Sequence, residues 1–144
     1  MKENKVKLPT LAEVSEAIDW IYEEGQKVFD TYKLCQNDET GEPCIHGDFC
    51  CSGCQYLTSK GCRVKAVWCK LWTCAAVMRK VKANPKLQPG LERLRDLNAY
   101  LIRTVPGYQY GRYCKATLIK QAKKAIERRN QDGKRYISDF KFYC

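Results

Sequence analysis

The hydrophobic residues of this chain recur mainly with the period of an α-helix. Thr10-x-x-Glu13 has the form of a capping box, which marks the start of a helix. The apolar residues that follow it are spaced for one helix face: Leu11, Val14, Ile18, Ile21, Val28 and Tyr32. We interpret this face as core packing rather than as a partner-binding stripe. Gly25 interrupts it and predicts a bend, and the turn-rich segment 37–43 ends the helix.

Three further helices are predicted downstream. Residues 65–82 are expected to form one helix that is apolar around most of its first half, which is typical of a buried helix. A third amphipathic helix is predicted over 91–102 and a fourth over about 116–129, while 136–144 is ambiguous between strand and helix. The breaks expected between these helices are at Asn84-Pro85, Pro89-Gly90 and Pro106-Gly107.

These patterns predict a mainly α single domain, with about four helices packed around a cysteine-rich metal-binding loop. A chain of 144 residues is long enough to bury a core without cross-links. Within 1–144 we distinguish an N-terminal helix and turn (1–43), the cysteine cluster with its buried helix (44–82), and C-terminal helices with a basic face (91–144).

The cysteines are concentrated in one part of the chain. Seven of the ten fall within 31 positions, and we take all seven as candidate metal ligands: Cys44, Cys50, Cys51, Cys54, Cys62, Cys69 and Cys74. The pair in Cys51-Ser-Gly-Cys54 has the spacing that lets two thiolates reach one metal ion. Closed zinc sites take four such ligands or three plus a histidine, and iron–sulfur clusters usually take four cysteines. We expect an iron–sulfur cluster such as 4Fe–4S, with Zn²⁺ as the alternative.

A run within this region resembles a known family. It reads Cys50-Cys51-x-x-Cys54-x-x-Leu57-x3-Gly61-Cys62-x6-Cys69-Lys70 and is similar to the YkgJ-type, CxxCxCC family of zinc- or iron-chelating domains. The resemblance implies a bound metal, and multidomain members such as flagellin lysine methylases imply an iron–sulfur cluster. It covers about a fifth of the chain. The departures from the family pattern are the leading Cys44-x5-Cys50-Cys51, Ala66-Val67 in place of Arg-Pro, and the extra Cys74.

A disulfide framework is the alternative explanation of the cysteines. Ten is an even number, and Cys35, Cys114 and Cys144 lie outside the cluster, as scattered disulfide partners would. His46, the single histidine, is either a fourth ligand or an exposed loop residue. The N-terminus has no apolar signal-peptide core and no run of the chain is apolar enough to span a bilayer, so we expect a cytoplasmic protein, where metal binding is commoner than disulfides.

The net charge of +10 is unevenly distributed. Between Cys50 and Leu91 there are eight basic and no acidic residues, and from Arg112 to Cys144 there are ten basic and three acidic residues. Such a field favours nucleic acid or an acidic protein as partner. The tyrosines of 108–113 lead into the basic face of the fourth helix. The candidate binding residues are Tyr110, Arg112, Lys115, Lys120, Lys123, Lys124, Arg128 and Arg129. The alternative is that the tyrosines cover the core and the lysines are solvated surface.

The sequence does not favour an enzyme, because one histidine leaves few catalytic pairs and no phosphate-binding glycine loop is present. We therefore expect a metal-cluster-binding module that binds nucleic acid or an acidic protein through its basic face. Two alternatives remain open. The cluster itself performs redox or one-carbon chemistry for a partner enzyme, or the chain is a disulfide-rich secreted effector.

Overall fold

The computed structural model describes residues 7–36, 39, 57–58, 61–62, 66–108 and 113–132, and within these ranges the fold is mainly helical. This confirms the predicted fold class at the level of helical content. Most of the cysteine-rich loop lies outside the described residues, so its packing stays a prediction. The elements, in chain order, are α1 Leu11–Tyr32, β1 Leu57–Thr58, β2 Gly61–Cys62, the 3₁₀-helix η1 Val67–Lys70, α2 Ala75–Ala83, the 3₁₀-helix η2 Pro85–Leu87, α3 Gln88–Thr104 and α4 Lys115–Asp132.

Helix α1 begins at the predicted cap. The Thr10 hydroxyl accepts a hydrogen bond from the backbone N–H of Glu13 at 3.1 Å, which satisfies one of the N–H groups left open at a helix start. The helix ends at Tyr32, before the segment 37–43 that was predicted to end it, because the C-cap Lys33 adopts a left-handed conformation with φ 49° and ψ 45°. Its apolar face is buried, and the interpretation of that face as core packing is confirmed. The residues buried there are Val14, Ile18, Ile21, Gly25 and Val28.

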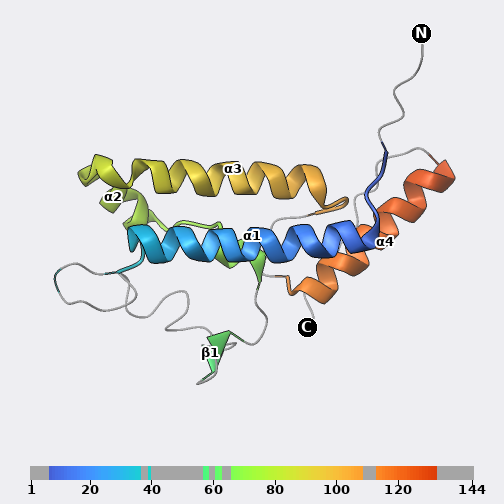
Figure 1. The fold of residues 1–144 in the computed structure, drawn as a ribbon, viewed down its shortest axis with the longest axis horizontal. Coiled ribbons are helices and arrows are strands. Elements are labelled where there is room, and N and C mark those ends of the chain that lie inside the picture. The colour runs from blue at the N-terminus through green and yellow to red at the C-terminus, as the bar shows by residue number, and fades with distance from the viewer. Residues whose placement is uncertain are drawn as a thin grey trace, which may run out of the picture.

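The helices pack around one hydrophobic core. Helices α1 and α3 run side by side, and α4 crosses the N-terminal half of α1 (Figure 1). Helix α3 contributes a regular series of leucines at intervals of three or four residues, and α4 contributes small and branched residues. The buried side chains that these two helices add to the core are Leu91, Leu94, Leu97, Leu101, Leu118 and Ala122.

The single helix predicted over 65–82 is wrong. The chain instead forms η1, an irregular connection, and then α2, whose N-cap Cys74 is extended with φ −77° and ψ 168°. In an unbroken helix Met78 would share a face with Leu71 and Cys74, which are both buried. The interruption changes this register, so that Val77 is buried and Met78 is 38% exposed.

Two of the three expected breaks are found where predicted. Asn84 ends α2, and its side chain accepts a hydrogen bond from the Lys86 N–H at 3.3 Å as η2 begins. After α3, Gly107 takes a positive φ of 71°, which favours glycine. Pro89, in contrast, lies in the first turn of α3, where its missing N–H would have had no helical partner.

Two features were not predicted from the sequence. Strands β1 and β2 form a short antiparallel pair in the cysteine-rich segment, with Leu57 opposite Cys62 and Thr58 opposite Gly61. Helix α4 also extends to Asp132, three residues beyond the predicted end. No helix in the described part of the chain has the length and apolar character needed to cross a bilayer.

Candidate metal and partner-binding sites

The structure describes the side chains of two of the seven candidate metal ligands. Cys69 lies on η1 and is partly exposed, while Cys74 precedes α2 and is a buried free thiol. Cys62 is described only as part of β2. The other four candidates, and His46, lie outside the described residues: Cys44, Cys50, Cys51 and Cys54. Among the side chains that are described, no three histidine, cysteine or acidic groups gather as metal ligands, so a shared site stays a prediction.

One lysine binds the chain directly after α1, just before the cysteine-rich segment of the sequence. The Lys80 ammonium of α2 donates to the backbone carbonyl of Lys33 at 2.9 Å and to that of Gln36 at 2.7 Å. Cys35, which lies between Lys33 and Gln36 in the sequence, packs against the core. Carbonyls at a helix C-terminus carry partial negative charge and lack helical partners, so a cation is favoured there. Sequence reasoning missed this anchor because 47 and 44 residues separate the bonded groups.

Cys114, which precedes α4, takes part in a disulfide bond. Its bonded partner is not one of the cysteine side chains that the structure describes. The Cys114 sulfur also lies 3.2 Å from the hydroxyl of Thr117, in the first turn of α4. At this one position the structure agrees with the disulfide alternative left open by the sequence.

Helix α4 separates basic from apolar residues. Leu118, Ala122 and Ala125 are buried against the core, as expected for an amphipathic helix with a basic outer face. On the opposite side of the helix the predicted basic residues Lys120, Lys123 and Lys124 are exposed. Gln121, by contrast, lies on the inner side, and its side chain is buried with no hydrogen-bond partner among the described residues.

The other candidate binding residues are placed less uniformly. Lys115 forms an ion pair with Asp19 of α1 at 2.6 Å, so part of its charge is already compensated within the protein. Arg128 is half-buried. Arg129 is exposed near the end of α4, although it follows Ala125 by four residues and shares the register of the buried stripe. Tyr110 and Arg112 lie outside the described residues.

The described tyrosines near this helix belong to the core. Tyr113 is buried, and Tyr108 is half-buried and packs against the core cluster. For these two residues the alternative that the tyrosines cover the core is therefore confirmed. Because the rings of Tyr108 and Tyr113 are packed into the core, they do not form an exposed surface on which a base could stack.

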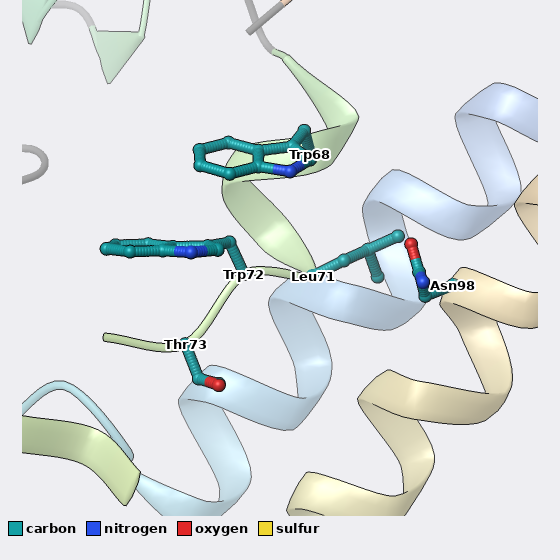
Figure 2. A pocket seen from close by; sticks show the side chains of 5 residues that line it. All are labelled: Trp68, Leu71, Trp72, Thr73 and Asn98. Atoms are coloured by element: carbon teal, nitrogen blue, oxygen red, sulfur yellow. The ribbon is translucent and has the colours of Figure 1, made fainter. Parts of the chain in front are cut away.

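A different aromatic site, absent from our sequence-based candidates, lies on η1 and the connection to α2. The indole rings of Trp68 and Trp72 stack, with ring centroids 5.3 Å apart and planes inclined by 21°. Figure 2 shows the two rings nearly parallel. They line a pocket of about 380 Å³. Leu71, Thr73 and, from α3, Asn98 complete its described lining. The signal in the sequence was two tryptophans four residues apart in a stretch with no acidic residue.

The remaining exposed tryptophan is held by polar and aromatic neighbours. Trp20 meets Tyr100 edge to face at 5.4 Å between ring centroids, and the Arg93 guanidinium lies 5.6 Å from the centroid of the Trp20 ring. Arg93 also pairs with Glu24 at 3.3 Å. The hydrogen bond from Lys27 to Glu24 and then that from Arg93 lower the pKa of the Glu24 carboxyl. This cluster joins α1 to α3 on the surface.

Comparison with known proteins identifies no relative, since no family model, curated protein or solved structure matches this chain. The resemblance of residues 44–74 to YkgJ-type domains therefore rests on the cysteine motif alone.

Proposed function

We propose that this chain is a small cytoplasmic metal-binding module that binds nucleic acid through the basic face of α4. The observation that carries the proposal is the division of this helix into a buried apolar stripe and an exposed side with Lys120, Lys123 and Lys124. Because the apolar stripe fixes the helix on the core, the exposed cations are held in one orientation. A fixed row of cations suits the regular negative charges of a phosphate backbone.

The charge distribution supports the same partner. The segment from Arg112 to Cys144 has ten basic and three acidic residues, and Glu127 is the one acidic residue among the α4 side chains that the structure describes. Phosphate binding by lysine and arginine releases condensed counterions, so affinity falls steeply with salt. An acidic protein would bind the same residues, and a polyglutamate peptide serves as a probe for that alternative partner.

The metal part of the proposal rests on the cysteine pattern. Cys62, Cys69 and ligands from 44–54 would hold an iron–sulfur cluster or Zn²⁺, which would stabilise the segment or respond to redox conditions. Cys69 fits this role better than Cys74, because Cys69 is partly exposed whereas Cys74 is buried in the hydrophobic core.

The test reverses two charges on α4. We expect Lys120→Glu with Lys123→Glu to weaken binding of a labelled oligonucleotide by at least about tenfold at low salt, measured by fluorescence anisotropy. The matched control is Lys82→Glu with Lys86→Glu, which changes the net charge equally at two exposed positions on α2 and η2. Metal content and helical circular dichroism should be unchanged in both variants.

Two outcomes would contradict the proposal. If the control variant weakens binding as much as the α4 variant, net charge rather than this face determines affinity. If the unaltered protein binds no oligonucleotide at low salt but binds a polyglutamate peptide through Lys120 and Lys123, the partner is an acidic protein instead.

A second function is favoured by one observation, the disulfide at Cys114. A disulfide-rich effector of an oxidising compartment would contain further disulfides and no metal. Alkylation of the native protein followed by mass spectrometry separates the two. The disulfide predicts that Cys114 is labelled only after reduction. If the cysteines of 44–74 are also blocked before reduction and no metal is bound, the protein is a disulfide-rich effector and not a metal-binding module.

A further inference from the structure

The tryptophan pair offers an exposed aromatic face in a fixed position. A backbone hydrogen bond of 2.9 Å joins the Trp72 N–H to the Trp68 carbonyl, which places the two indoles one turn apart. They stack, and Trp72 remains 39% exposed. Such exposure is notable because tryptophan is usually well buried. Because the Trp72 ring already stacks on Trp68, it has little rotamer freedom left to lose when a ligand binds.

The pocket beside this face combines apolar and polar groups. Leu71 supplies an apolar wall, and Asn98 lies beside it from the neighbouring helix α3 (Figure 2). The Asn98 side-chain amide makes no hydrogen bond with another described residue, so both its donor and its acceptor are available. The Thr73 hydroxyl donates to the Met78 sulfur at 3.4 Å and retains acceptor capacity. The described lining is therefore uncharged, with one open amide next to a π-face.

One exposed basic residue of α3 lies close to Asn98 in the sequence. Arg95 is exposed and precedes Asn98 by three residues on α3, a spacing that puts two side chains on the same helix face. The chain from Cys50 to Leu91, which contains both tryptophans, has no acidic residue. The segment with the tryptophans therefore brings no carboxylate to the pocket, while α3 carries exposed acidic residues, Glu92 and Asp96, beside Arg95.

We propose that Trp72, backed by Trp68, stacks on an unpaired base of single-stranded nucleic acid, with Asn98 at the edge of that base and Arg95 near its phosphate. Base–aromatic stacking tolerates any sequence, whereas the asparagine amide can pair with a base edge. The inference rests on the proposed function and deepens it: the basic face of α4 binds the backbone, and the tryptophan pair selects single strands over duplexes. A sugar ring would also stack on tryptophan, but it has no anionic group for the Arg95 guanidinium.

The experiment measures single-strand binding with tryptophan fluorescence. In a Trp20→Phe background, which leaves only Trp68 and Trp72 as emitters, a single-stranded oligonucleotide should quench the emission and the duplex of the same sequence should quench it less. Trp72→Ala should weaken single-strand binding by about 5- to 100-fold while leaving duplex binding within about twofold. Trp72→Phe, which keeps a ring, should restore most of the affinity.

The matched control is Trp20→Ala. Trp20 is 42% exposed, close to the exposure of Trp72, but its ring is engaged by Tyr100 and Arg93. This variant should leave single-strand affinity unchanged. Equal losses for Trp20→Ala and Trp72→Ala, or equal quenching by a neutral oligosaccharide, would overturn the stacking site.

The outcomes also separate this inference from the proposed function. If Lys120→Glu with Lys123→Glu weakens single-strand binding and Trp72→Ala does not, the basic face stands and the stacking site is wrong. If the unaltered protein binds neither single strands nor duplexes, both are wrong. Circular dichroism of Trp72→Ala should match that of the parent protein, which excludes misfolding as the cause of a loss.

Discussion

The backbone carbonyl of Lys70 lies against Gly25 so closely that a β-carbon added at residue 25 would be 2.7 Å from the carbonyl oxygen. The same β-carbon would be 2.9 Å from the Lys70 β-carbon. The absence of a side chain at this glycine of α1 therefore allows η1, the element that carries Trp68 and Cys69, to pack closely against the helix.

We expect Gly25→Ala to destabilise the protein by about 1–3 kcal/mol, the usual effect of forcing an extra group into a packed core. This loss should exceed the gain of about 1 kcal/mol that alanine gives in a helix. Urea unfolding followed by circular dichroism measures the difference. Glu23→Ala, at an exposed position two residues earlier, serves as the control and should change stability by less than about 0.5 kcal/mol. A more stable Gly25→Ala protein would show that the close approach is not maintained.

Lys80→Met tests the anchor on the end of α1. It keeps the length of the side chain but removes the ammonium that binds the Lys33 and Gln36 carbonyls. Because hydrogen bonds to a charged donor contribute about 1.5–3 kcal/mol, we expect faster amide hydrogen exchange over 33–36 and a stability loss of about that size. Lys82→Met, on the same helix but exposed, should change neither. Unchanged exchange in Lys80→Met would contradict the anchor.

Acid should weaken the Glu24 cluster. Hydrogen bonds from Lys27 and then Arg93 hold the pKa of Glu24 below its ordinary value of 4.5 in the folded protein. A carboxyl whose folded pKa is depressed stabilises the fold above its unfolded pKa, and that contribution is lost as the pH falls through the folded value. The stability difference between the parent and Glu24→Gln should therefore be present at neutral pH and disappear in acid. Glu16→Gln, exposed on the same helix, provides the comparison. A constant difference down to acid pH would rule out this linkage.

Removal of one predicted ligand tests the metal site. Cys54→Ser should lose most of the bound metal, because ligation and folding of such a site are coupled. Cys35→Ser, which alters a cysteine outside the predicted ligand set, should retain it. Iron, sulfide and zinc analysis of protein purified without oxygen, together with the visible spectrum, gives the answer. Equal metal content in Cys54→Ser and the parent would remove Cys54 from the site.

The parts of the fold that the sequence predicts are those governed by local rules. The cap at Thr10 and the stripes of α1, α3 and α4 depend on residues three or four apart, and each is found close to its predicted place. The break between η1 and α2 depends on which residues meet the rest of the core, as the burial of Val77 in place of Met78 shows. Helical periodicity alone contains no information about that choice.

The candidate sites divide in the same way. The exposure of Lys120 and Lys123 follows from the register of one helix, so it was predictable. The pocket beside Trp72 was not, because Asn98 comes from another helix 26 residues away and only the packing of α3 brings it there. The ion pair of Lys115 with Asp19 is likewise a product of tertiary contact, between groups 96 residues apart.

Gln36, whose carbonyl binds Lys80, and the buried pair Ala66 and Val67 are fixed points on either side of the cysteine-rich segment. When two ends are fixed, doubling the length of a flexible connection between them costs only about 0.6 kcal/mol. Insertions, deletions and shifts in cysteine spacing can thus accumulate there during evolution while the helices stay the same. We expect related chains to share helices α1 to α4 and the close packing of Lys70 on Gly25, and to differ most in the length of the segment between Gln36 and Ala66.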